Sequence, residues 1–359
     1  MSKVMAKRSR LRFLLLGYFG HGNLGDEMML GAFLSGMRGL AEFDAAVISG
    51  DAGETRRTHA VMSIHKFNML AIAAQILGSD ATVGCGGSLL QDATSFRSLL
   101  YYASLLLLSR CLGSKAILLA QGLGPLRRQV SRRLASLALR SCSLLTFRDT
   151  ESFELALKLG AERDKVHLTS DLAFIIEPPF EAAPPSGQIG LSIAVRDWRG
   201  AHEVAKCIAQ GVLTFTPRIS SVRCISLSRE DEPLSEWLCE QLGSLNAVHI
   251  APTSICDLWK AIDGVHLLIG VRLHSLIAAC MVGVPTIAIS YDPKVKAFMN
   301  AFAPRLCIPW DEVSAERIVE CIVECLDGWS KLHEAALQFA LTSRALSKRN
   351  LTLLLDVLP

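Results

Sequence analysis

The sequence lacks Cys-x-x-Cys pairs, although it contains 11 cysteines, scattered from Cys85 to Cys325. Because their number is odd and their spacing irregular, a disulfide framework is not expected, and the missing pairs argue against a zinc ribbon. Most of the cysteines stand among apolar neighbours, which predicts small buried thiols in a protein of a reducing compartment. The sequence shows no other metal-binding cluster, so we expect no metal.

Long uninterrupted apolar runs are also missing. Residues 13–16 form an apolar run of only four before Gly17, whereas the hydrophobic region of a signal peptide needs about 7 to 15. The longest apolar stretch, Leu99–Gln121, is interrupted by Arg110 and Lys115, so it falls short of the roughly 18 residues expected of a spanning helix. We therefore expect neither a signal peptide nor a membrane span, and we expect a cytoplasmic location.

Charge of one sign is in small excess. The chain has 37 Lys and Arg against 34 Asp and Glu, a net charge of +3, which argues against a surface devoted to nucleic acid. Basic patches must therefore be local, and such patches are either solvated faces or sites attracted to an anionic membrane surface, where each basic residue contributes about 1 kcal/mol. The two candidate patches consist of Lys3, Lys7, Arg8, Arg10 and Arg12, and of Arg127, Arg128, Arg132, Arg133 and Arg140.

The length and the apolar pattern predict a two-domain α/β protein. The 359 residues fit two domains of about 150 to 180 residues each. An apolar fraction of 50% and a mean hydropathy of +0.34 exclude a disordered chain. Short apolar runs alternate with longer segments of helical period, the pattern of a parallel sheet covered on both faces.

Each half shows this alternation. A proline-rich stretch, Ile176–Gln188, predicts a linker, and the segment after Ser314 predicts helix to the end. We expect an N-terminal domain over residues 1–177, a C-terminal domain over residues 189–330 and a helical tail over residues 331–359. The expected strands are 12–16, 45–49, 81–84, 116–120 and 144–147, then 189–194, 222–226, 247–250, 264–269 and 285–290. The expected helices include 26–40, 66–77, 95–112, 129–140, 150–159 and 272–281.

A glycine-rich segment follows the first expected strand. Residues 17–27 read GYFGHGNLGDE and lead directly into a helix. Glycines let backbone N–H groups approach a ligand, and a helix N-terminus favours an anion, so an anionic or sugar ligand fits here. The spacing matches a dinucleotide fingerprint, but no suitable acid ends the second strand. Asp26 and Glu27 are equally explained as carboxylates that stabilise the helix dipole.

Further motifs follow the fourth and later strands of the first half. Residues 84–95 read GCGGSLLQDATS, residues 120–125 read AQGLGP, and Arg148-Asp149 ends the fifth strand. All stand at the carboxyl edge of the sheet, where α/β folds bind ligands. A tight turn capped by Asp92 and Ser95 explains the turn but not its three glycines. Arg148 and Asp149 are as well explained by pairing with each other.

The second half carries arginines at corresponding places. Arg196 ends a strand, and Arg272, Leu273 and His274 open a helix. An arginine presents a planar fork to carboxylate or phosphate, so two of them beside a helix N-terminus predict a pocket for a small polyanion. His274 is placed to exchange protons with such a ligand, although a single histidine is more often structural. Tyr291 and Lys294 follow the next strand and are expected to frame the same pocket.

In order, these segments resemble the polysaccharide pyruvyl transferase family, and more narrowly its bacterial cell-wall branch, CsaB. The resemblance rests on GYFGHGNLGDE, GCGGSLLQDATS, AQGLGP, Arg148-Asp149, SIAVRDW, GVRLHSLIAA and SYDPKVKAF, and spans about residues 12–300. Cys85 and Ser275 depart from the usual pattern without removing a polar group that the chemistry needs.

The resemblance implies a GT-B-like fold, with two Rossmann-like doubly wound domains facing a cleft. It also implies transfer of pyruvate from phosphoenolpyruvate, with no further cofactor, to a cell-wall or exopolysaccharide sugar as a 4,6-ketal. The expected acceptor is a lipid-linked N-acetylmannosamine unit, and peripheral contact with the inner face of the cytoplasmic membrane is a further expectation.

The resemblance also suggests roles for individual residues. Arg196, Arg272 and the backbone of Leu273 would hold phosphoenolpyruvate. His274 would donate a proton to its enol carbon, and Asp26 would be the base on the acceptor hydroxyl. The acceptor sugar would lie at the first-domain loops, among Asn23, Gly25, Gly86, Gly87, Gln91 and Asp92.

Two other functions remain open on the sequence. A GT-B nucleotide-sugar glycosyltransferase would have the same architecture, because fold does not fix function. A non-catalytic protein that binds an anionic glycan would keep the glycine loops, although the combination of Arg196, Arg272 and His274 speaks against it.

Overall fold

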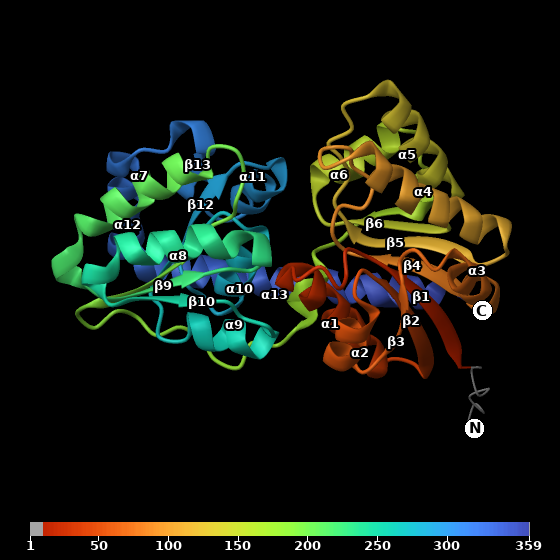
Figure 1. Cartoon of the computed structure of the whole chain (residues 1–359), viewed down its shortest axis with the longest axis horizontal. Coiled ribbons are helices and arrows are strands. Elements are labelled where there is room, and N and C mark those ends of the chain that lie inside the picture. The colour runs from red at the N-terminus through yellow and green to blue at the C-terminus, as the bar shows by residue number, and fades with distance from the viewer. Residues whose placement is uncertain (1–9, 359) are drawn as a thin grey trace. The chain divides into compact units, whose positions relative to one another are not determined.

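The computed structural model describes residues 10–358 and contains two parallel β-sheets covered by helices (Figure 1). The first sheet has seven strands in the order β3-β2-β1-β4-β5-β6-β7, and the second has six in the order β10-β9-β8-β11-β12-β13. Every strand pair within them is parallel. The prediction of two doubly wound, Rossmann-like halves is confirmed.

The strands are short, and most of their residues are buried, as expected where helices cover both faces of a sheet. Their bounds are β1 Leu11–Leu16, β2 Phe43–Ser49, β3 Met62–His65, β4 Ala81–Cys85, β5 Lys115–Gln121, β6 Leu144–Phe147, β7 Val166–Leu168, β8 Ile189–Ala194, β9 Ile219–Ile225, β10 Ala247–Ile250, β11 Leu267–Gly270, β12 Thr286–Ser290 and β13 Cys307–Pro309.

The helices connect successive strands and frequently begin with a capping side chain, such as Asp51, Ser95 or Asp149. Their bounds are α1 Leu24–Arg38, α2 Ala52–His59, α3 Met69–Gly78, α4 Phe96–Cys111, α5 Gln129–Ser141, α6 Thr150–Lys158, α7 Ala201–Leu213, α8 Glu232–Gln241, α9 Ile255–Ile262, α10 Leu273–Met281, α11 Pro293–Asn300, α12 Ala315–Asp327 and α13 Trp329–Asp356.

The chain forms two compact units. The first comprises the chain up to His21, residues 29–175 and Leu346 onward; the second comprises Gly22–Met28 and residues 176–345. Residues 176–188, the expected linker, contain neither helix nor strand. The whole first glycine motif was predicted to belong to the N-terminal domain, whereas Gly22–Met28 group with the second unit.

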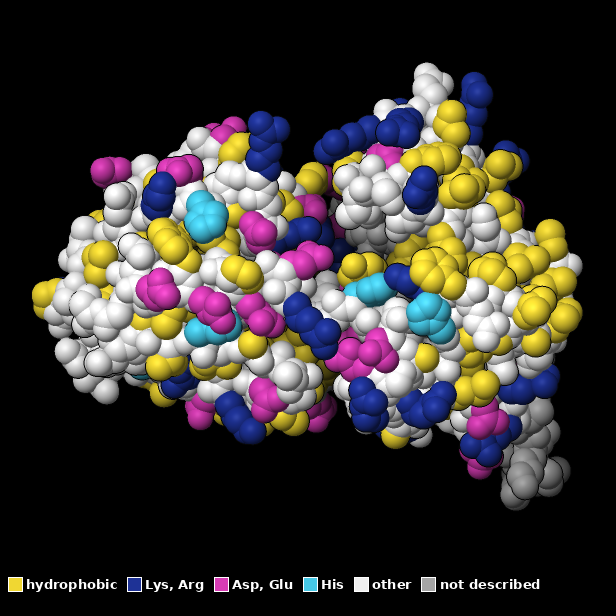
Figure 2. Space-filling model, in the orientation of Figure 1, with side chains coloured by type: hydrophobic (Ala, Val, Ile, Leu, Met, Phe, Trp, Pro, Cys, Tyr) yellow, Lys and Arg dark blue, Asp and Glu magenta, His cyan; other side chains and the backbone are white. Residues whose placement is uncertain are grey.

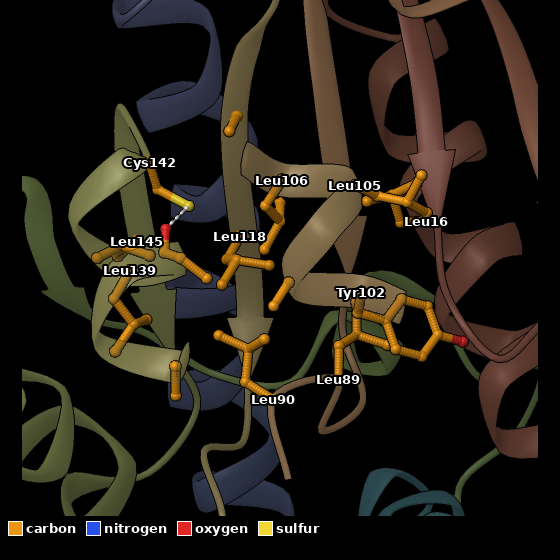
Figure 3. Close-up of a cluster of buried hydrophobic side chains, with 14 of the residues drawn as sticks. Leu16, Leu89, Leu90, Tyr102, Leu105, Leu106, Leu118, Leu139, Cys142 and Leu145 are labelled. Carbon is orange, nitrogen blue, oxygen red and sulfur yellow. Dashed lines mark hydrogen bonds between the residues drawn. The ribbon is translucent and has the colours of Figure 1, made fainter. Parts of the chain in front are cut away.

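The core of the first unit is aliphatic. In Figure 3, Leu106 of α4 lies beside Leu118 of β5, and Leu105 of α4 lies beside Leu16 of β1. All four side chains are at most 1% exposed. Cys142 belongs to the same cluster, and burial raises the pKa of its thiol to about 12. This thiol therefore acts as a small apolar side chain at neutral pH.

Each sheet reverses its strand order at one point, and the motifs lie there. In the first sheet β1 pairs with β2 on one side and β4 on the other, so the loops after β1 and β4 flank the reversal. In the second, β8 pairs with β9 and β11, which places Arg196 and Arg272 at the corresponding loops. Ligands of open α/β sheets bind at such points.

Candidate functional site

A buried ion pair of the second unit joins Arg272 to Asp231. Arg272 is the N-cap residue of α10, and its Nε and Nη2 donate to Oδ2 and Oδ1 of Asp231 at 2.6 and 2.7 Å. The Asp231 side chain is fully buried, and its Oδ1 also accepts a hydrogen bond from the backbone N–H of Asp197 at 3.0 Å. Asp231 therefore fixes the segment after β8 and the start of α10 together.

Arg196 lies beside this pair on an aromatic surface. Its guanidinium carbon is 4.5 Å from the ring centroid of Tyr291, and Tyr291 stacks on Trp198 at 5.4 Å. Burial, followed by the charge of Arg272, lowers the pKa of Arg196. Within residues 10–358, Arg196 has no ion pair. Its guanidinium is thus held by ring stacking, an arrangement that leaves its N–H donors without a carboxylate partner.

His274 lies in the first turn of α10 and packs against Gly25. A Cβ added at Gly25 would stand 2.1 Å from Nδ1 of the imidazole, so only glycine allows this approach. The start of α1 is held there by the hydrogen bond from Leu24 N–H to the carbonyl of Leu227, at 2.8 Å, and by a bridge between Asn23 and Ser228. The first turns of α1 and α10 therefore lie together, and both favour negative charge.

Asp26 belongs to the same group. Its Oδ2 accepts a hydrogen bond from Asn23 Nδ2 at 2.5 Å. Burial raises the pKa of Asp26 to about 6, although His274, Lys294 and Arg272 act in the opposite direction. A carboxyl with this pKa changes protonation state close to neutral pH, the property required of a general acid or base.

Lys294, Tyr291 and Leu273 complete the group. Asp292 caps α11: its Oδ1 accepts a hydrogen bond from the backbone N–H of Lys294 at 3.1 Å, and its Oδ2 forms an ion pair with Lys294 Nζ at 3.3 Å. Tyr291 contacts Arg196 directly, as above, while the ammonium of Lys294 acts on Asp26. Leu273 is the first residue of α10, so its N–H is among those with no acceptor inside the helix.

The glycine loop after β4 is built differently. Gly86 and Gly87 have φ of 65° and 77°, angles that favour glycine, and an added Cβ at Gly86 would lie 2.2 Å from Sδ of Met29. Gln91 Oε1 accepts from the N–H groups of Ala93 and Thr94, at 2.6 and 3.1 Å. Gly86 is therefore required because the backbone of this loop packs closely against Met29, which belongs to the same unit.

Asp92 also has a structural contact. Its carboxylate accepts hydrogen bonds from the backbone N–H groups of Arg127 and Arg128 at 2.9 to 3.1 Å. Burial acts to raise the pKa of Asp92, but the hydrogen bonds from these two N–H groups and the nearby charge of Arg128 bring it below its ordinary value. Asp92 ties the loop after β4 to the segment before α5, and Ser95 alone caps α4.

The structure therefore divides the predicted residues between the two units. Gly86, Gly87, Gln91 and Asp92 belong to the first unit. The second unit brings the others together, namely Asn23, Gly25, Asp26, Arg196, Arg272, Leu273, His274, Tyr291 and Lys294.

Several contacts of these residues were not predicted from the sequence. Asp231 was not singled out, and its only signal is an acid a few residues after a strand. The suggested pairing of Arg148 with Asp149 is wrong: Arg148 Nη1 binds Asp171 Oδ2 at 2.6 Å, with both side chains at most 6% exposed. Asp149 instead caps α6 by accepting from Ser152 N–H at 2.7 Å. Arg148 and Asp171 are distant in sequence, which explains the error.

The part of the chain that carries these residues matches a known family. The family described as polysaccharide pyruvyl transferase matches residues 23–293, three quarters of the chain. The chain belongs to the polysaccharide pyruvyl transferase family. The match begins at Asn23 and ends at Pro293, so every predicted site residue except Lys294, the next in the chain, lies inside it.

A distant relative of this chain is named as an amylovoran biosynthesis protein. The amylovoran biosynthesis protein AmsJ of Erwinia amylovora is 22% identical over 291 residues, which cover 71% of this chain and 67% of AmsJ. The relationship supports a polysaccharide-modifying enzyme in the same family.

Solved structures support the fold. The UDP-N-acetylglucosamine 2-epimerase of Neisseria meningitidis, solved with UDP-GlcNAc, has a TM-score of 0.65 at 12% identity, covering 96% of this chain and all of the epimerase. The putative UDP-N-acetylglucosamine 2-epimerase of Listeria monocytogenes has a TM-score of 0.69 at 11% identity, with 96% of each chain covered. Anabaena HepE, solved with UDP and glucose, has a TM-score of 0.62 at 14% identity, covering 97% of this chain and 98% of HepE. At these identities the likeness establishes a GT-B-like fold.

Proposed function

We propose that this pyruvyl transferase transfers pyruvate from phosphoenolpyruvate to a cell-wall or exopolysaccharide sugar as a 4,6-ketal. The acceptor in this proposal is a lipid-linked saccharide carrying N-acetylmannosamine, and the enzyme acts in the cytoplasm. The observation that carries the proposal is the grouping of Arg196, Arg272, His274 and Asp26 in one unit.

The charges of this group suit phosphoenolpyruvate, which has a carboxylate and a phosphate on three carbons. Arg196 has donors available, and its lowered pKa reflects burial beside a second guanidinium, a situation that a bound anion relieves. Arg272 spends two N–H groups on Asp231 and retains three of its five. The N-terminus of α10, starting with the Leu273 N–H, adds further donors.

The chemistry needs one proton donor and one acceptor. In the proposal, protonated His274 gives its proton to the enol CH₂ carbon, which becomes a methyl group and leaves the adjacent carbon cationic. A sugar hydroxyl attacks that carbon and loses its proton to Asp26. Phosphate then leaves with its bonding electrons, and the second hydroxyl closes the ring while its proton passes to phosphate or solvent. The sum is phosphoenolpyruvate plus diol giving ketal plus phosphate.

The two functional groups have suitable surroundings for these steps. Asp26, with a pKa of about 6, is largely ionised at neutral pH yet still basic enough to accept a hydroxyl proton. The Gly25 backbone holds one side of the imidazole of His274. The acceptor loops of the proposal are those of Asn23 and Gly25 and, in the first unit, of Gly86 and Gly87, with Gln91 and Asp92 shaping the latter.

The test is incubation with phosphoenolpyruvate and a panel of lipid-linked and synthetic sugars, with phosphate release and product mass measured together. We expect phosphate release only with an accepted sugar and a product heavier by one pyruvyl ketal. His274→Ala should abolish both. His202→Ala is the matched control, because His202 is also the second residue of a helix of this unit. Sugar transfer from a nucleotide sugar, without turnover of phosphoenolpyruvate, would identify a glycosyltransferase instead.

A further inference from the structure

One long segment of the first unit contains no acidic residue. Between Asp92 and Asp149 no Asp or Glu occurs, while nine basic residues do. They are Arg97, Arg110, Lys115, Arg127, Arg128, Arg132, Arg133, Arg140 and Arg148. The segment includes the whole of α4 and α5, and the preceding helix α3 has no charged residue at all. In a chain with a net charge of only +3, this is a local concentration of positive charge.

Helices α3, α4 and α5 lie on one face of the first sheet. They connect β3 to β4, β4 to β5 and β5 to β6, all progressing in the same direction along the strand order. Because such crossovers are right-handed, the three helices cover the same face. The Tyr101 hydroxyl of α4 donates to the carbonyl of Lys66 at 2.7 Å, which attaches α4 to the loop that leads into α3.

Large apolar side chains on this face are exposed rather than buried. Leu70 and Leu77 of α3 are 87% and 65% exposed, and Phe67, just before the helix, is 72% exposed. Met69 and Leu100, on the same helices, are 48% and 44% exposed. Figure 2 shows the hydrophobic side chains gathered over α3 and α4. We refer to these five residues as the α3–α4 apolar patch.

Exposed arginines accompany the apolar patch. Arg97 and Arg110 stand on α4, and the others stand on α5 or just before it, namely Arg127, Arg128, Arg132, Arg133 and Arg140. Two acids beside the face are engaged: Asp80 with Arg12, and Asp92 with the backbone before α5. In the N-terminal candidate patch, Arg10 and Arg12 pair with Asp44 and Asp80, and Lys3, Lys7 and Arg8 lie outside the described residues.

We propose that the face formed by α3, α4 and α5 docks on a membrane surface of anionic lipid. The α3–α4 apolar patch inserts among the lipid chains at the interface, and the arginines contact the headgroup phosphates. This docking would hold the enzyme at the membrane that carries a lipid-linked acceptor. The role of docking in reaching the acceptor rests on the proposed function. Among residues 10–358 no helix has the length and apolar character to cross a membrane.

Charge favours a lipid surface over a second copy of this chain. A two-fold dimer through this face would place the same arginines opposite one another. The three helices have no acidic side chain to pair with them. An anionic membrane offers a partner for each part of the face, namely apolar chains for the α3–α4 apolar patch and dense negative charge for the arginines.

The experiment is co-sedimentation of the full-length protein with vesicles of phosphatidylcholine alone and with added phosphatidylglycerol. We expect binding to the anionic vesicles that weakens as NaCl is raised. Leu70→Ser with Leu77→Ser, and separately Arg132→Gln with Arg133→Gln, should each weaken binding roughly tenfold or more. The control variants are Leu40→Ser, on an exposed leucine after α1, and Arg56→Gln with Arg57→Gln on α2, which should bind like wild type.

Transfer to a soluble synthetic acceptor separates this inference from the proposed function. The Leu70→Ser, Leu77→Ser variant should keep that activity while losing vesicle binding. A wild type that transfers pyruvate but ignores anionic vesicles would overturn the docking proposal alone, and vesicle binding without transfer would overturn the function alone. A concentration-dependent dimer in sedimentation velocity that Leu70→Ser with Leu77→Ser dissolves, together with unchanged vesicle binding, would assign the patch to a second copy.

Discussion

The buried carboxylate of Asp231 holds the guanidinium of Arg272 through two hydrogen bonds, at 2.6 and 2.7 Å. The contact aligns an arginine at the start of α10 and leaves part of its fork for a ligand. Arg272 thus has two functions in this account: it neutralises a buried acid, and it presents positive charge at the helix N-terminus.

Removing Asp231 should therefore damage both stability and function. Asp231→Ala leaves a buried guanidinium without its carboxylate, so the free energy of unfolding should fall by about 3 to 5 kcal/mol. Urea denaturation followed by circular dichroism measures this. Glu203→Ala, which breaks the exposed Lys206–Glu203 pair, should change stability by less than about 1 kcal/mol. Equal effects of the two substitutions would contradict the importance of the buried pair.

Asp26→Asn should stabilise the protein above pH 6 while abolishing transfer. The folded protein binds the Asp26 proton more tightly than the unfolded chain, because the pKa rises from 3.8 to about 6. Stability therefore falls as pH rises through this interval, and above it the charged carboxylate costs up to about 3 kcal/mol. The asparagine variant avoids that cost, so its advantage should be about 1 to 3 kcal/mol at pH 8.

The pH series identifies the group responsible. The difference in unfolding free energy between Asp26→Asn and wild type should shrink as pH falls from 6 towards 4. The kcat/KM of the wild type should rise through an apparent pKa near 6 as Asp26 ionises. A stability difference independent of pH would show that the carboxyl is not perturbed as described.

Gly25→Ala should displace the imidazole of His274. The added methyl carbon would come within 2.1 Å of Nδ1, so the ring or the start of α1 must move. We expect kcat to fall at least about a hundredfold, since small displacements of a catalytic group cost this much. Gly243→Ala is the control, because a Cβ there meets no atom within 4 Å. Wild-type turnover in Gly25→Ala would separate His274 from the chemistry.

Of the two arginines, Arg196 is the one whose substitution should weaken substrate binding without lowering stability. Arg196→Ala should weaken phosphoenolpyruvate binding at least tenfold in calorimetry with little loss of stability, because its side chain holds no ion pair among the described residues. Tyr291→Phe keeps the aromatic face beneath the guanidinium and should bind nearly normally, whereas Tyr291→Leu removes it. Unchanged affinity in Arg196→Ala would remove this residue from the anion site.

Much of the fold could be predicted because buried strands of a parallel sheet are continuous apolar runs, as in residues 116–120, which read AILLA and are all buried. Helix α2 and strand β3 were missed for the opposite reason. Residues 52–59 are largely polar and exposed, and in Met62–His65 only the two central residues are buried. The single helix expected after Ser314 is two helices, which meet at Gly328.

The candidate site was predictable where the chemistry is local. Arg272 and His274 are neighbours on one helix start, so their sequence places them together. Asp231 could not be found this way, because its contact with Arg272 spans 41 residues and depends on the pairing of β8 with β9 and β11. The grouping of Gly22–Met28 with the second unit likewise depends on contacts made after folding, such as that of Leu24 with Leu227.

The most direct test of the account is transfer carried out in heavy water, with the pyruvyl product analysed by mass spectrometry. Protonation of the enol carbon of phosphoenolpyruvate predicts a ketal whose methyl group carries one deuterium that does not wash out, and His274→Ala should form none. A ketal without deuterium, or a product in which a hexose rather than pyruvate has been added to the acceptor, would contradict the account.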